Sequence, residues 1–153
     1  MKTTVLKTAA LAVAAIVLFA LPAMAQEEEG IIKHRQAVMA AIGGHFGAMS
    51  RILKGQVKFT GDLKTHARAI ADLAGIAARV FPEGSDFGDT RALEDIWKKP
   101  KEFKKILDAF KTETAKLVKI ADGGDVKAFG DQFKALGKNV CGTCHKAFRE
   151  KKK

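Results

Sequence analysis

The chain has little cysteine, two residues among 153, so no other thiol pairing competes with whatever chemistry these two perform. Beyond the first 25 residues it has no long apolar run, which argues against a membrane span in a processed chain. Strand-like alternation and internal repeats are also missing, and low-complexity sequence is confined to short runs of lysine and glutamate. These absences leave a single helical domain as the predicted class.

Both cysteines belong to one motif, Cys141-Gly-Thr-Cys144-His145, near the C-terminus. The C-x-x-C-H spacing is the attachment signal for a c-type haem. On a helix these three side chains are related as i, i+3 and i+4, so they project from one face. Two thiols can then bond the porphyrin vinyl groups while the imidazole lies under the iron. The motif predicts one covalently attached haem c, with His145 as the proximal ligand.

Three other uses of the motif fit less well. A disulfide between Cys141 and Cys144 conflicts with the narrow S–S geometry, because a helical i, i+3 pair rarely meets it. A thioredoxin-like redox pair requires a neighbouring βαβ pattern, and no strand pattern precedes the motif. A zinc site would have two Cys and one His but no obvious fourth ligand at nearby spacing.

The N-terminus has the pattern of a secretory signal, residues 1–25. Lys2 and Lys7 form a basic region, and Thr8 to Leu21 is an apolar run too short for a comfortable membrane span. Ala-Met-Ala, ending at Ala25, is a cleavage site. We expect the mature domain, residues 26–153, to be soluble in the periplasm, where covalent haem attachment takes place in bacteria. An uncleaved membrane anchor is the alternative.

Acidic residues are the minority, 17 against 27 lysines and arginines, which gives a formal net charge of +10. Loss of the signal removes two lysines and no acidic residue. A basic surface favours acidic redox partners or an anionic membrane surface. Export argues against a nucleic-acid partner.

Apolar periodicity predicts four helices and an all-α fold. The expected ranges are residues 28–53, 63–81, 100–121 and 126–148, with Asp62 and Asp125 as N-caps and Pro100 in a first turn. Residues 82–91, rich in glycine, proline and aspartate, form the long connection. Short connections elsewhere favour an up-down-up-down antiparallel four-helix bundle, with the haem near the C-terminal end of the last helix.

In this topology the end of the last helix lies beside the beginning of the first. The first helix therefore supplies the distal side of the iron, and a domain starting at residue 26 has only two methionines, Met39 and Met49. Ten residues separate them, about 15 Å along a helix, so at most one can reach the iron. Met39 lies nearer the level of His145 and in the inward stripe. It is either the sixth ligand or an ordinary core residue, and His34 is a rival ligand on the flank of the stripe.

Arg35 is a charged residue in the middle of that apolar stripe. An unpaired charge there would be costly, and a haem propionate would offer a bidentate partner. Snorkelling of Arg35 from the open end of the bundle is the alternative.

Several segments together resemble the cytochrome c′ family, also called class II cytochromes c. They are Arg35-Gln36 with Met39, Lys54-Gly55, Gly88-Asp89-Thr90-Arg91 leading to Ile96-Trp97, and the haem motif followed by Ala147-Phe148-Arg149. The resemblance covers essentially the whole domain after the signal. It implies that Arg35, Gln36 and Asp89 lie near the haem edge.

The family has two branches. High-spin, five-coordinate members bind nitric oxide or carbon monoxide and are often dimers, whereas low-spin members use a methionine of the first helix as sixth ligand. The segment from Phe81 to Pro100 looks more like the low-spin branch. The resemblance thus implies a periplasmic electron carrier with His145 and Met39 as ligands, and a gas-binding protein as the alternative. An enzyme fits less well, because the sequence offers no distal acid–base group at the level of the iron unless His34 reaches inward. A homodimer through exposed faces of the first two helices is an alternative to a monomer.

Overall fold

The computed structural model describes residues 29–151, and the predicted signal peptide lies outside them. The first helix covers residues 29–53. It is followed by α2 (Asp62–Ile76), which tightens into the 3-10 turn η1 (Ala77–Val80), and by a short α3 (Asp95–Lys98). The long α4 (Pro100–Gly123) precedes α5 (Val126–Leu136), the π-helical segment η2 (Gly137–Gly142) and α6 (Thr143–Phe148). Within residues 29–151 there is no named strand, and one isolated bridge joins Ala92 to Arg149.

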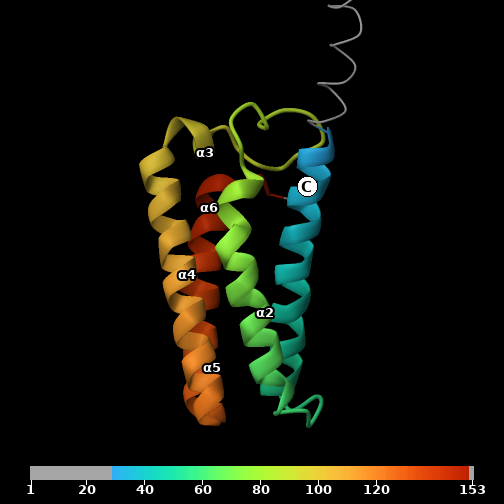
Figure 1. Ribbon diagram of the computed structural model, residues 1–153, viewed down its shortest axis with the longest axis vertical. Helices are drawn as coiled ribbons and strands as arrows, with labels where there is room; N and C mark the ends of the chain where they lie inside the picture. The colour runs from blue at the N-terminus through green and yellow to red at the C-terminus, as the bar shows by residue number, and fades with distance from the viewer. Residues whose placement is uncertain (1–28, 152–153) are drawn as a thin grey trace, which may run out of the picture.

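These elements form a four-helix bundle, as predicted (Figure 1). Its four columns are the first helix, α2 with η1, α4, and the continuous run of α5, η2 and α6. The loop after Val80 and helix α3 lie together at one end of the bundle, beside α6 and the start of the first helix. That end is where the predicted haem residues meet.

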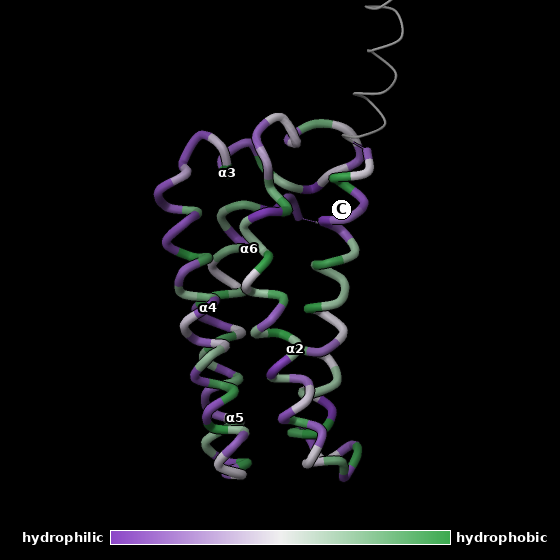
Figure 2. The backbone as a smooth tube through the Cα atoms, in the orientation of Figure 1, coloured by the Kyte–Doolittle hydropathy of each residue, from purple (hydrophilic) through white to green (hydrophobic). Residues whose placement is uncertain are grey.

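The core consists of the apolar stripes that the sequence pattern predicted. Figure 2 shows apolar positions recurring along the inner sides of the helices. Met49, Ile70, Leu117, Phe129 and Leu136 are fully buried. Each column contributes to this core, so burial of apolar surface holds the four helices together.

The helix ends agree with the sequence at two positions and disagree at a third. Pro100 is at the start of α4, and the Asp125 carboxylate accepts a hydrogen bond from the Ala128 N–H at 2.9 Å. The prediction that Asp62 is an N-cap was wrong. Asp62 is the first residue of α2, Gly61 occupies the cap position, and no side chain caps that helix. A tight turn, in which the Asp62 N–H donates to the Phe59 carbonyl, begins the helix one residue earlier than expected.

None of the helices described for residues 29–151 is long and apolar enough to cross a bilayer.

Candidate haem site

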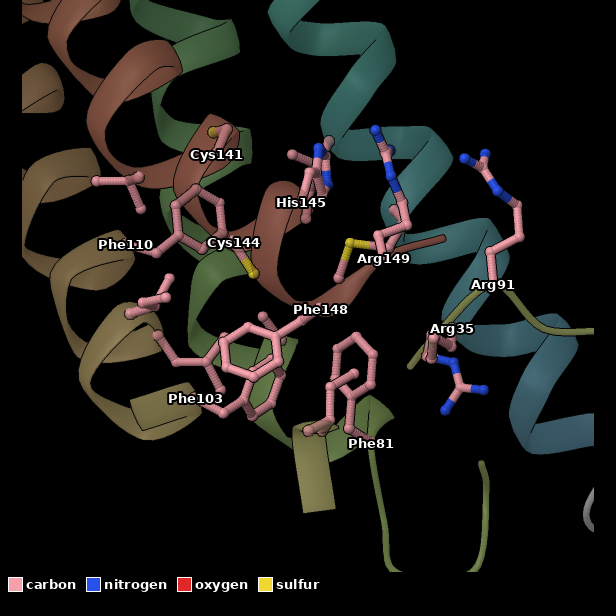
Figure 3. Close-up of a pocket in the computed structure, with 18 of the residues that line it drawn as sticks. Arg35, Phe81, Arg91, Phe103, Phe110, Cys141, Cys144, His145, Phe148 and Arg149 are labelled. Atoms are coloured by element: carbon pink, nitrogen blue, oxygen red, sulfur yellow. The ribbon is translucent and has the colours of Figure 1, made fainter. Parts of the chain in front are cut away.

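A cavity of about 300 Å³ opens between the first helix and the α6 end of the bundle. Cys141, Cys144 and His145 line one wall, and Met39 and Ile42 of the first helix also line the cavity. Two aromatic contacts lie among the residues that line it, near the end of the bundle that carries α3. Phe103 meets Phe81 edge-on at 5.1 Å between ring centroids, and it meets Phe148 in the same way at 5.2 Å (Figure 3). The arrangement provides an apolar slot with a few polar groups at its rim.

The prediction that the haem motif lies on one regular α-helix was wrong. Cys141 is in the π-helical segment η2, whereas Cys144 and His145 are in α6. All three nevertheless line the same cavity. Gly137, the first residue of η2, approaches the first helix closely, because a Cβ there would lie 2.8 Å from Cζ of Phe46. The wide turn therefore begins where the last column packs against the first helix.

Burial sets the protonation of the motif. Both cysteines are free, and burial raises their pKa values, that of Cys144 to about 11, so both are thiols at neutral pH. Burial also lowers the pKa of His145, and the nearby positive charges of Arg149 and Arg91 lower it further. The imidazole is therefore mainly neutral at pH 7, and a neutral imidazole has a lone pair to give to iron.

Arg91 and Arg149 line the cavity but were not predicted as site residues (Figure 3). Arg149 directly follows α6, with an extended backbone that pairs with Ala92, so helical spacing from His145 does not account for its place. Arg91 is brought there by the antiparallel bridge, in which the Glu150 N–H donates to the Arg91 carbonyl at 2.8 Å. No sequence pattern indicated that pairing.

Arg35 lines the cavity with its stem, but its guanidinium turns away from His145 (Figure 3). Nη1 donates to Ser85 Oγ, and Nη2 donates to the Ser85 carbonyl and to Thr90 Oγ1, each at 2.8 Å. The charge also lies 5.1 Å from the centre of the Phe81 ring. Arg35 thus fastens the long loop to the first helix, a role that the sequence did not reveal. Pairing with a propionate stays a prediction.

The other predicted residues fall in two places. Gln36 lines the cavity, and its Nε2 donates to the Asp89 carbonyl at 2.7 Å. Asp89 is not among the cavity residues; it lines a neighbouring hollow with Gln36, Phe87 and Gly88. The rival methionine Met49 is fully buried in the core, and His34 is exposed, so neither lines the cavity.

The residues present fit a covalently bound haem. Two free thiols and a neutral imidazole share one wall of a slot whose lining is mainly apolar and aromatic, as a flat porphyrin requires. Cys141 and Cys144 would hold the porphyrin edge, and His145 would bind the iron. Haem supplies one-electron redox chemistry when bound.

Comparison with known proteins supports this assignment. The family model described as Cytochrome C' matches residues 30–149. Cytochrome c' of Pararhodospirillum photometricum is 36% identical over 125 residues, which is 80% of this chain and 98% of that protein. Cytochrome c-556 of Agrobacterium tumefaciens strain B2A is 32% identical over 133 residues, or 80% of this chain and 99% of that protein.

Solved structures agree with the fold. Cytochrome c prime from Shewanella frigidimarina superposes with a TM-score of 0.76 at 33% identity, covering 81% of this chain and 97% of that one. A ferrous variant of cytochrome c prime from Alcaligenes xylosoxidans with bound NO gives a TM-score of 0.75 at 29% identity, covering 82% and 97%. Because the family model spans nearly all described residues, this chain belongs to the cytochrome c′ family, whose members carry covalently bound haem c.

Proposed function

We propose that this protein carries single electrons in the periplasm, with His145 and Met39 as the axial ligands of its haem iron. The observation that carries the proposal is that Met39 is the one methionine among the residues lining the cavity that His145 also lines. A thioether is a good sixth ligand for haem iron and raises its reduction potential. His34, the only other ligand candidate on the first helix near that level, is exposed and outside the cavity.

The chain's own residues suit electron transfer better than catalysis. The cavity lining described for residues 29–151 includes no histidine other than His145 and no aspartate or glutamate, so no second side chain is placed there for general acid–base work. Most of the lining consists of apolar and aromatic side chains, and the cations Arg91 and Arg149 are also part of it. These cations favour an acidic redox partner.

Gas binding is the second candidate. Ile42 and the phenylalanines make the cavity apolar, which suits a small neutral ligand, and a related cytochrome c prime has been solved with bound NO. In that case Met39 would fill the cavity and guard access without binding the iron.

Visible spectra of the exported holoprotein, oxidised and reduced, with and without carbon monoxide, separate the two candidates. We expect sharp low-spin bands that the gas does not change. Met39→Ala should give a high-spin spectrum and a carbon monoxide adduct, because the sixth position loses its thioether. Met49→Leu is the matched control and should leave the spectrum unchanged. A high-spin, gas-sensitive spectrum in the unmodified protein would replace electron transfer with gas binding.

A further inference from the structure

Two histidines meet between the first helix and α2, outside the haem site. Nδ1 of His45 lies 2.9 Å from Nδ1 of His66, and the ring centroids are 5.2 Å apart with a 55° angle between the planes. Both side chains are half-buried, and neither lines the haem cavity. His45 follows Met39 by six residues, about 9 Å farther along the helix. The haem chemistry therefore leaves this pair unused.

The short contact between the two ring nitrogens limits what they can hold. One Nδ1 must carry the proton and the other must offer a lone pair, since two lone pairs or two N–H groups would repel. A metal ion in place of that proton would be bound by both lone pairs after a rotation of the rings about χ2. Neutral imidazole nitrogen is the commonest protein ligand for such ions.

The separation of the nitrogens is close to that of two ligands of one metal ion. Two metal–nitrogen bonds of about 2.0 Å at a right angle place the nitrogens about 2.8 Å apart, whereas a tetrahedral angle places them about 3.3 Å apart. The 2.9 Å of the hydrogen-bonded pair lies between these two values, and the rings must rotate before they bind an ion, so this separation does not select the geometry. Cu(II) is favoured by affinity, because it binds nitrogen ligands more tightly than Zn(II).

The charges around the pair do not oppose a cation. The first helix has no charged residue between Arg35 and Arg51. On α2, the Nζ of Lys64 and the Nη2 of Arg68 lie 2.7 Å and 3.1 Å from Oδ1 of Asp122 in α4. The cations closest to His66 along α2 are therefore paired with a carboxylate on a different helix.

Water can reach the pair, because both histidines are only partly buried. There is also open space beside the backbone next to His45, since a Cβ added at Gly44 would meet no atom within 4 Å. In the described part of the chain no third His, Cys, Asp or Glu joins the pair to form a larger metal-binding group. Water would therefore complete the coordination of a bound ion.

We propose that His45 and His66 form a Cu(II) site that bridges the first helix and α2, separate from the haem. The test is calorimetric titration of the ferric holoprotein with Cu(II), with Zn(II) titrated in parallel. We expect one Cu(II) per chain. His45→Gln and His66→Gln should each weaken binding at least about tenfold, because each removes one of only two protein ligands. Zn(II) should bind at least about tenfold more weakly than Cu(II).

His34→Gln is the matched control, since His34 is an exposed histidine on the same helix. It should bind Cu(II) like the unmodified protein. Unchanged affinity in both pair variants would overturn the site, and equal affinity for Zn(II) would overturn the assignment to Cu(II). Electron paramagnetic resonance of Cu(II) bound to the unmodified protein tests the site even if the histidine variants do not fold. It should show coupling to two histidine nitrogens that changes when histidine is isotopically labelled, and its absence would refute the proposal.

Discussion

At the scale of single residues, Arg35 shows how one charge is made stable inside a bundle. Its side chain is 4% exposed, and burial lowers the pKa of the guanidinium, which still keeps its charge at neutral pH. Three hydrogen bonds to Ser85 and Thr90 replace the lost water. They join residues some 50 positions apart in the chain, so Arg35 fixes the loop that reaches from η1 to the cavity rim.

Replacement of Arg35 by lysine tests that role. An ammonium cannot reproduce the planar fork that contacts both the hydroxyl and the carbonyl of Ser85. We expect Arg35→Lys to lower the free energy of unfolding by about 2 to 3 kcal/mol, the range for lost hydrogen bonds to a charged group. Urea unfolding of the ferric holoprotein measures this loss. Arg51→Lys is the control, since Arg51 is exposed and bonds only to Gly47 one turn earlier, so it should change stability by less than about 0.5 kcal/mol. Equal losses in the two variants would contradict the loop-fastening role.

At the scale of helices, apolar spacing predicted the columns well because one face of each helix must be buried. The helix ends depended on finer geometry. Asp125 has an extended backbone that places its carboxylate over the Ala128 N–H, whereas Asp62 is already inside the helix. An aspartate before an apolar stripe therefore indicates that a helix begins nearby. The turn that precedes the helix decides which residue becomes its N-cap.

This difference gives a matched pair of variants. Asp125→Ala should lower the free energy of unfolding by about 1 kcal/mol, because it removes a side-chain cap. Asp62→Ala should cost only a few tenths of a kcal/mol, since Asp62 contributes only its charge near the helix N-terminus. Chemical unfolding of the two holoproteins under the same conditions compares them. A larger loss for Asp62→Ala would show that the tight turn at Phe59 depends on that carboxylate.

The π-helical segment was beyond prediction from periodicity. Leu136 and Gly137 fit the apolar stripe about equally well, and that ambiguity falls where the helix widens. A π-turn shifts the register of the residues after it, so Cys141 reaches the cavity from a different turn than Cys144 and His145. Sequence spacing alone could not distinguish this geometry from a regular helix, because both leave the motif on one side.

Gly137→Ala tests the packing that accompanies the π-turn. Its new Cβ would lie 2.8 Å from Phe46, whose ring is stacked on Phe133 at 4.0 Å and has little freedom to move. We expect a loss of about 1 to 3 kcal/mol in the free energy of unfolding, as for other overpacked cores. Gly130→Ala is the control, because its Cβ would make an ordinary 3.7 Å contact with Leu53, and better helix propensity should stabilise α5 by up to about 1 kcal/mol. Equal stabilisation in both variants would mean that Phe46 yields without cost.

At the scale of the whole molecule, the site was predictable where local chemistry defined it and not where the chain folds back. The haem motif, Met39 and Gln36 were found from spacing and resemblance, and all of them line the cavity. Arg91 was missed because its place depends on the bridge between Ala92 and Arg149, and these two residues are far apart in the sequence. Asp89 was expected near the haem edge, but its carbonyl instead accepts the Gln36 amide beside the cavity.

The positive net charge, +10 for the full chain and two lower once the two lysines of the predicted signal are removed, gives the last prediction, for electron transfer by the holoprotein. Oxidation of the ferrous protein by ferricyanide, an anion, should slow severalfold as salt rises from about 0.01 M to about 0.2 M, because screening weakens attraction over this range. A cationic cobalt oxidant should respond in the opposite direction. Stopped-flow rates measure both dependences.

Arg91→Gln should lower the low-salt ferricyanide rate more than Lys119→Gln does, although both variants lose one positive charge. Arg91 lines the cavity, whereas Lys119 is exposed on α4, nine residues beyond Phe110, the last α4 residue in the lining, or about 13 Å along the helix. Local charge at the rim then governs the encounter more than net charge does. Equal effects would instead mean that net charge alone steers the oxidant, and electrons would not leave preferentially beside Arg91.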